Sequence, residues 1–169
     1  MRGMMLRYLM FWGIVILSVT AGLGMWQERG GNIAALRYIN TETQTNDGGT
    51  ITLNQRRDGH YYANLMINGR DIHFLVDTGA TDLVLTKQDA LRIGLDEDDM
   101  AFNRQASTAN GTVKSATVRL DDVQFGPFSD QSVTASVNGG DMQTSLLGMT
   151  YLRRFDTIQI SDGKMILER

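Results

Sequence analysis

Residues 74–85, FLVDTGATDLVL, constrain the fold of this chain more than any other stretch of its sequence. An Asp-Thr-Gly triplet, which begins at Asp77, lies between two runs of apolar and β-branched residues. Such runs are typical of buried β-strands, whereas Asp and Gly are typical of turns. The segment therefore predicts a strand, a sharp loop that carries Asp77, and a second strand.

A carboxylate on a rigid loop suits acid–base hydrolysis of a peptide bond, because it can hold and deprotonate a water molecule. That chemistry takes two carboxylates, but the chain contains a single Asp-Thr-Gly between apolar runs. The pairs at residues 58–59, 156–157 and 162–163 only approximate it. A hydrolase therefore needs a second carboxylate from a second copy of the chain. The plain alternative is a hairpin corner without chemistry.

The segment resembles the active-site loop of retropepsin-like aspartic proteases, the half-sized, homodimeric relatives of pepsin. Two further segments fit that family in the expected order: residues 107–112 resemble its flap hairpin, and Leu-Leu-Gly at residues 146–148 resembles its apolar-apolar-Gly signature. The resemblance spans roughly residues 51–169 and is nearest to bacterial members that carry one amino-terminal membrane anchor. It implies an all-β fold, a small closed barrel with one or two short helices, preceded by a single transmembrane helix.

The pattern after residue 50 agrees with strands. Asn68-Gly69 separates two alternating runs and suits a type I′ hairpin, whose second strand would place Ile72, Phe74 and Val76 on one face. Thr86 and Asp89 predict the capping box of a short helix that ends at Gly94. Short strands are expected at residues 113–120, 123–125 and 133–137, a short helix at 151–155, and a terminal hairpin at 157–167. In relatives, such terminal strands build the dimer interface.

The resemblance also implies a role for each site residue. Asp77 would be the catalytic residue, paired with its symmetry mate. Thr78 would hydrogen-bond across the dimer, Gly79 would let backbone amides approach the carboxylates, and Ala80 replaces a hydroxyl residue found in many pepsins. The flap would comprise Thr108, Ala109, Asn110, Gly111 and Thr112, although an ordinary surface hairpin fits this segment too, and Leu146, Leu147 and Gly148 would support the loop and the pocket wall.

Two carboxylates about 3 Å apart share one proton, because both cannot ionise cheaply. One would act as base towards a water molecule while the other, protonated, polarises the scissile carbonyl. Because Ala80 cannot stabilise the charged form by a hydrogen bond, we expect a mildly acidic pH optimum.

Composition excludes several other classes of function. The formal net charge of −3 argues against a dedicated nucleic-acid binder, because such proteins usually carry a basic stripe. The chain has no cysteine, and His60 and His73 lie in no metal-ligand spacing. We therefore expect no metal and no other cofactor.

The amino-terminal segment, residues 1–26, predicts export. Residues 8–26 form an uncharged, mostly apolar run of the length that crosses a bilayer, and Arg2 and Arg7 precede it. The positive-inside rule then places the amino terminus in the cytoplasm and the remaining chain across the membrane, on the periplasmic side if the source is bacterial. A cleavable signal peptide, cut after Val19-Thr20-Ala21, is the alternative.

Residues 27–50 are polar and are expected to form a juxtamembrane linker before the protease domain at 51–169. The resulting hypothesis is a membrane-anchored, homodimeric aspartic endopeptidase that cleaves polypeptides. Two alternatives stay open at this point: a non-catalytic peptide-binding or assembly module on the same barrel, and a structural envelope protein whose Asp-Thr-Gly is only a turn.

Overall fold

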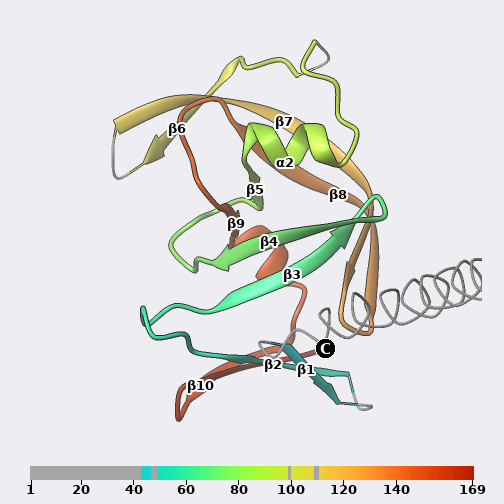
Figure 1. Ribbon diagram of the computed structural model, residues 1–169, viewed down its shortest axis with the longest axis vertical. Coiled ribbons are helices and arrows are strands. Elements are labelled where there is room, and N and C mark those ends of the chain that lie inside the picture. Colours follow the sequence, from blue (N-terminus) through green and yellow to red (C-terminus); the bar gives the residue numbers. More distant parts are fainter. Residues whose placement is uncertain (1–42, 47–48, 99, 109–110) are drawn as a thin grey trace, which may run out of the picture. The chain divides into compact units, whose positions relative to one another are not determined.

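The computed structural model describes residues 43–46, 49–98, 100–108 and 111–169, all within the compact unit Thr41–Arg169 (Figure 1). The predicted membrane-spanning run and most of the predicted linker lie outside the described residues. Within the described part of the chain, no helix is both long and apolar enough to span a membrane. The elements are β1 (Thr43–Asn46), β2 (Thr50–Asn54), β3 (Tyr62–Ile67), β4 (Arg70–Val76), β5 (Val84–Leu85), α2 (Lys87–Arg92), β6 (Arg104–Thr108), β7 (Gly111–Phe125), β8 (Phe128–Asn138), β9 (Ser145–Leu147), α3 (Met149–Leu152), β10 (Thr157–Ser161) and β11 (Lys164–Glu168).

The strands form a closed barrel and a separate small sheet. A seven-stranded sheet has the order β3-β4-β9-β5-β8-β7-β6, and an additional β3–β7 pairing closes six of its strands into a ring, with β6 added outside β7. A four-stranded sheet has the order β1-β2-β11-β10. The expected all-β closed barrel with short helices is therefore confirmed.

Two tight hairpins turn through residues with positive φ, and for Asn68-Gly69 this turn was predicted. Asn68 and Gly69 have φ of 49° and 73°, and Asp162 and Gly163 have φ of 49° and 69°. Both residues of a type I′ turn need positive φ, which Asn, Asp and Gly tolerate best. The turns fix the registers of β3 on β4 and of β10 on β11.

The core follows from strand alternation. Ile72, Phe74 and Val76 are buried on one face of β4 as predicted, whereas His73 is exposed on the other. Each large aliphatic or aromatic side chain buried in this way contributes about 1.5–3 kcal/mol to folding. The four-stranded sheet also presents a buried face, formed by Ile51, Leu53, Met165 and Leu167.

Helix α2 is capped as predicted, but only by half of the expected capping box. The Thr86 side chain accepts a hydrogen bond from the Asp89 backbone N–H at 3.0 Å. The Thr86 N–H donates instead to Oγ of Ser145 at 3.1 Å, and that hydroxyl donates to the Asp89 carboxylate at 2.6 Å. Ser145, which is fully buried at the start of β9, thus stands between the two capping residues and ties β9 to the helix.

Several predicted element boundaries differ from the structure. The two strands expected before and after residues 121–122 are one strand, β7, because Asp122 remains in the ladder opposite Gln131 and its N–H donates to the Asn68 side chain. Helix α3 begins at Met149, two residues earlier than expected, and ends at Leu152. Within the segment assigned to the linker, residues 43–46 form β1, which pairs with β2.

Candidate active site

Asp77 directly follows β4, and its backbone is attached to two neighbouring segments. The Val76 N–H donates to the Tyr61 carbonyl at 2.9 Å, and the Asp77 N–H donates to the Leu147 carbonyl on β9 at 3.1 Å. The next loop turns back at once, because the Ala80 N–H donates to the Asp77 carbonyl at 3.2 Å. The aspartate therefore sits on a loop held by both flanking strands of the barrel.

The Asp77 side chain is fixed by the loop that follows it. Its Oδ1 accepts a hydrogen bond from the Gly79 N–H at 2.8 Å, and the residue is half-buried. A Cβ atom on Gly79 would lie 3.2 Å from the same oxygen, closer than ordinary contact. The absence of a side chain on this glycine thus allows its amide to approach the carboxylate.

Gly148 allows a second close approach beneath the loop. A Cβ atom there would lie 2.1 Å from the Asp82 carbonyl oxygen and 2.7 Å from that of Ala80. Immediately after it, the Met149 N–H donates to the Ala80 carbonyl at 2.9 Å and the Thr150 N–H to the Thr81 carbonyl at 2.8 Å. The start of α3 therefore supplies backbone donors to the carbonyls of the loop that follows Asp77, and Leu147 and Gly148 lie next to that loop.

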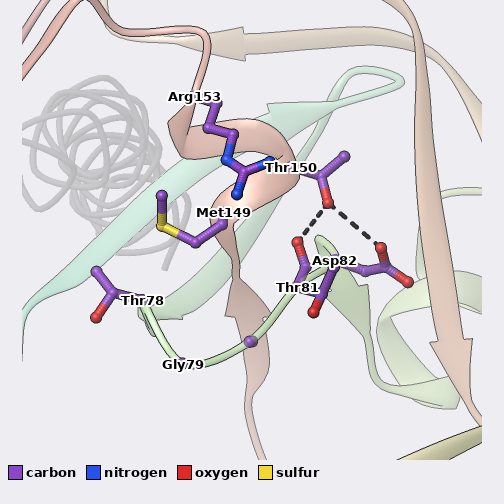
Figure 2. A pocket seen from close by; sticks show the side chains of 8 residues that line it. Thr78, Gly79, Thr81, Asp82, Met149, Thr150 and Arg153 are labelled. Atoms are coloured by element: carbon purple, nitrogen blue, oxygen red, sulfur yellow. Dashed lines mark hydrogen bonds between the residues drawn. The ribbon is translucent and has the colours of Figure 1, made fainter.

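Asp82 and Thr150 complete this support, although the sequence reasoning missed both. The Asp82 carboxylate accepts hydrogen bonds from Ser136 at 2.7 Å and from Thr150 at 3.3 Å. Figure 2 shows the Thr150 hydroxyl between this carboxylate and the Thr81 carbonyl, to which it also donates. These partners lie 54 or more residues away in the chain. In the sequence, the only sign of these contacts is the acidic character of Asp82, five positions after Asp77.

A cleft of about 470 Å³ opens between the active loop and α3 (Figure 2). Arg153, also missed by the sequence reasoning, supplies its positive charge, and Met149 supplies an apolar wall. Asp77 is not part of the lining, so the cleft lies beside this residue rather than over it. Its lining consists of Thr78, Gly79, Ala80, Thr81, Asp82, Met149, Thr150 and Arg153.

An apolar strip near Asp77 crosses strands β4, β9 and β5. Leu146 pairs with Leu75 on one side and with Val84 on the other, and all three are half-buried. By strand alternation, Leu75 and Asp77 point to the same side of the chain. Of the three, only Leu146 was predicted to form part of a pocket wall.

The predicted flap is a hairpin formed by β6 and β7, at one end of the seven-stranded sheet. Thr108 pairs with Gly111, while Ala109 and Asn110, which were also predicted to belong to the flap, lie outside the described residues. Thr112 pairs with Ser107 in the arms. In Figure 1 the amino-terminal end of β7 and the loop after β4 are both on the left.

Comparison with known proteins gives the family of the chain. The model of the family described as gag-polyprotein putative aspartyl protease matches residues 63–154. An uncharacterized protein of Rickettsia prowazekii is 39% identical over 119 residues, which are 70% of this chain and 51% of that protein. The chain spans about half the length of the curated relatives it matches.

Solved structures give the fold. A retropepsin-like aspartic protease from Rickettsia conorii has a TM-score of 0.62 and 38% sequence identity, covering 70% of this chain and 89% of that one. The EIAV protease in complex with the inhibitor HBY-793 has a TM-score of 0.50 and 18% identity, covering 59% of this chain and 90% of that one. At that identity, the second likeness concerns the fold alone.

Proposed function

This chain belongs to the retropepsin-like aspartyl protease family, and on that premise we propose that it is an aspartic endopeptidase that acts as a homodimer. Asp77 of each copy would supply one carboxylate of the catalytic pair. A two-fold axis that passes between the two loops would bring each Asp77 next to its own image.

The observation that carries this proposal is the fixed position of Asp77. Its carboxylate accepts from the Gly79 amide at 2.8 Å, and its loop is bonded to β9 and to the start of α3. A catalytic carboxylate must be held in this way, because a displacement of about 1 Å costs a large part of the rate. A plain turn does not need a glycine as closely enclosed as Gly148.

The reaction would use a water molecule as the nucleophile. The ionised carboxylate takes a proton from that water as it attacks the scissile carbonyl carbon, and the protonated carboxylate donates a hydrogen bond to the carbonyl oxygen. The proton taken from the water then passes to the leaving amine as the tetrahedral intermediate collapses. Because the nucleophile is water, this route forms no acyl-enzyme.

The substrate would be an extended polypeptide. Its apolar side chains would lie on the strip formed by Leu75, Val84 and Leu146, and the β6–β7 hairpin would close over it as the flap. Thr78, which is exposed on the loop, would hydrogen-bond to its symmetry mate and hold the two loops together.

We also propose that residues 8–26 anchor the protein in a membrane. Their uncharged apolar run and the preceding Arg2 and Arg7 support an orientation with the protease domain on the exported side.

The first test is cleavage of an unfolded protein by the purified full-length chain over about pH 3 to 7. We expect cleavage with a mildly acidic optimum. The cleavage rate should fall at least about 10³-fold in Asp77→Asn, because the substitution removes both carboxylates of the pair, one from each copy. Asp162→Asn, in the exposed β10–β11 turn, is the matched control and should retain full activity. Equal inactivity of wild type and Asp77→Asn, at concentrations where the chain is dimeric, would end the catalytic proposal.

A further inference from the structure

The loop between β2 and β3, residues 55–61, lies next to Asp77. Tyr62 pairs with Leu75 at the start of β3, and a backbone hydrogen bond of 2.9 Å continues the ladder one pair further. The pair after that, in the same register, is His60 and Asp77. Directly opposed residues of two antiparallel strands have their side chains on the same face, so the β2–β3 loop ends on the face of Asp77. Figure 1 shows this loop and the loop after β4 at the left ends of β3 and β4.

Hydrogen bonds hold the β2–β3 loop in one conformation, although its residues up to His60 are exposed. The Arg56 N–H donates to the His60 carbonyl at 2.8 Å, and the Gly59 N–H donates to the Arg56 carbonyl at 3.0 Å. The Asp58 carboxylate accepts from the His60 N–H at 2.9 Å and from the Tyr62 hydroxyl at 2.8 Å. A loop that is already ordered can present its side chains to a ligand at a low entropic cost.

An aromatic stack joins this loop to the apolar strip. The Tyr62 and His73 rings are stacked, with centroids 5.1 Å apart, and the Arg56 guanidinium carbon lies 4.2 Å from the centroid of the Tyr62 ring. A guanidinium is attracted to the face of an aromatic ring, which keeps the cation at a defined place. Since Tyr62 is half-buried beside Leu75, it lengthens the strip, and Arg56 lies at the end of that strip.

The loop has an excess of positive charge, because Arg56 and Arg57 stand against Asp58 alone. The hydrogen bond from the His60 N–H, followed by that from the Tyr62 hydroxyl, lowers the pKa of Asp58. The Asp58 carboxylate therefore stays ionised and holds the loop together at mildly acidic pH. The charged and titratable side chains around this face are Arg56, Arg57, Asp58 and His60 on the loop, Tyr62 on β3, Asp71, His73 and Asp77 on β4, and Asp162 and Lys164 in the β10–β11 turn, which is bonded to the loop.

We propose that the β2–β3 loop recognises an acidic side chain of the substrate, and that Arg56 contacts its carboxylate. This inference rests on the proposed function, because it concerns the peptide that lies on the apolar strip. Alternate side chains of an extended peptide point to the same side and lie about 7 Å apart. A peptide with one apolar side chain on the strip therefore presents the side chain two residues away to the loop. Arginine binds carboxylates through two parallel hydrogen bonds, which suits it to this task.

The expected size of the preference follows from the exposure of the loop. Ion pairs in contact with solvent contribute about 1 kcal/mol or less, which corresponds to a preference of about fivefold for glutamate over glutamine. An acidic residue should thus tune the choice among apolar peptides without being required for cleavage.

The first experiment measures kcat/KM of the full-length protein for peptides that differ only in a single glutamate or glutamine, moved through the positions around the scissile bond. At one position we expect about a fivefold preference for glutamate at pH 6, which should disappear in Arg56→Gln. Arg119→Gln, an exposed arginine on β7, removes the same charge elsewhere and should keep the preference. Arg56→Glu should instead favour lysine at that position. Absence of a preference in the wild type, or its persistence in Arg56→Gln, would overturn the proposal.

The pH dependence separates recognition of charge from a structural role of Arg56. A substrate glutamate has an ordinary pKa of about 4.3, so it is ionised at pH 6 and largely protonated at pH 3. The ratio of kcat/KM for the glutamate and glutamine peptides should therefore fall towards one as the pH is lowered. A ratio that stays constant over this range would contradict contact with a carboxylate.

A binding experiment tests the inference independently of catalysis. Fluorescence anisotropy measures the Kd of the same labelled peptides on full-length Asp77→Asn and on Asp77→Asn combined with Arg56→Gln. We expect about fivefold tighter binding of the glutamate peptide by the first protein and equal binding of both peptides by the second. If the wild type cleaves no peptide, the proposed function fails, but this measurement still decides the inference. Equal Kd values on Asp77→Asn would overturn it.

Discussion

Gly148 shows how strongly a single residue can constrain the active loop. Its φ of −92° is accessible to any residue, so the backbone conformation itself does not require glycine. The requirement comes from the Asp82 and Ala80 carbonyls, which fill the position of a Cβ atom. Any side chain here must displace the loop that carries Asp77.

We therefore expect Gly148→Ala to lower the free energy of unfolding by about 3 kcal/mol or more, since overpacking against backbone cannot be relieved by a rotamer change. Gly94→Ala is the matched control, because Gly94 has a φ of +89° but nothing within 4 Å of its Cβ position. That control should lose only about 1–2 kcal/mol, from backbone strain. Urea denaturation of both variants measures the difference, and an equal or smaller loss in Gly148→Ala would contradict this account.

At the scale of the secondary-structure elements, Asp130 joins β8 to α3 and β11. Its side chain is 4% exposed and accepts hydrogen bonds from Arg169 at 2.6 Å, Arg154 at 3.0 Å and the Tyr151 hydroxyl at 3.1 Å. The Arg169 hydrogen bond, followed by that of Tyr151, holds the pKa of Asp130 below its ordinary value despite burial. In turn, burial and the neighbouring Asp130 charge raise the pKa of Tyr151.

A lowered pKa in the folded state means that this carboxylate stabilises the fold above its unfolded pKa, near 4, and loses that contribution as the pH falls through the folded value. Asp130→Asn should therefore cost about 2 kcal/mol at pH 7, a figure reduced for the partly exposed arginines, and progressively less towards pH 2. Denaturant melts at both pH values test this against Asp141→Asn, an exposed control that should cost less than about 0.5 kcal/mol. A cost that is independent of pH would disprove it.

The sequence predicted those elements whose signals are local. The Asn68-Gly69 turn, the Thr86 cap and the loop of Asp77 each depend on residues within a few positions of one another, and the structure contains all three. Ser145 and Asp82 were not predicted to matter, because their partners Asp89 and Ser136 lie 56 and 54 residues away. Spacing along one chain carries no information about such contacts, which only the closed barrel brings together.

At the scale of the whole molecule, activity should depend on how many copies meet. If the proposed anchor holds two chains in one membrane, their effective concentration rises far above that in dilute solution. We expect the specific activity of the full-length protein to fall on dilution in detergent but to remain constant on dilution of vesicles at a fixed protein-to-lipid ratio. Identical dilution curves in the two media would rule out a contribution of anchoring to assembly.

The hydrogen bonds that immobilise the Asp77 loop also determine which segments must be synthesised before that loop is held in place. Thr81 accepts from Thr150, 69 residues later in the chain, and Asp77 itself donates to Leu147. Contacts of such sequence separation form late in folding, because a long loop must close first. During synthesis the amino-terminal part of the barrel emerges well before its partners. A nascent chain therefore carries Asp77 on an unsupported loop until β9 and α3 have been made, so that any capacity to cleave requires the synthesis of both elements.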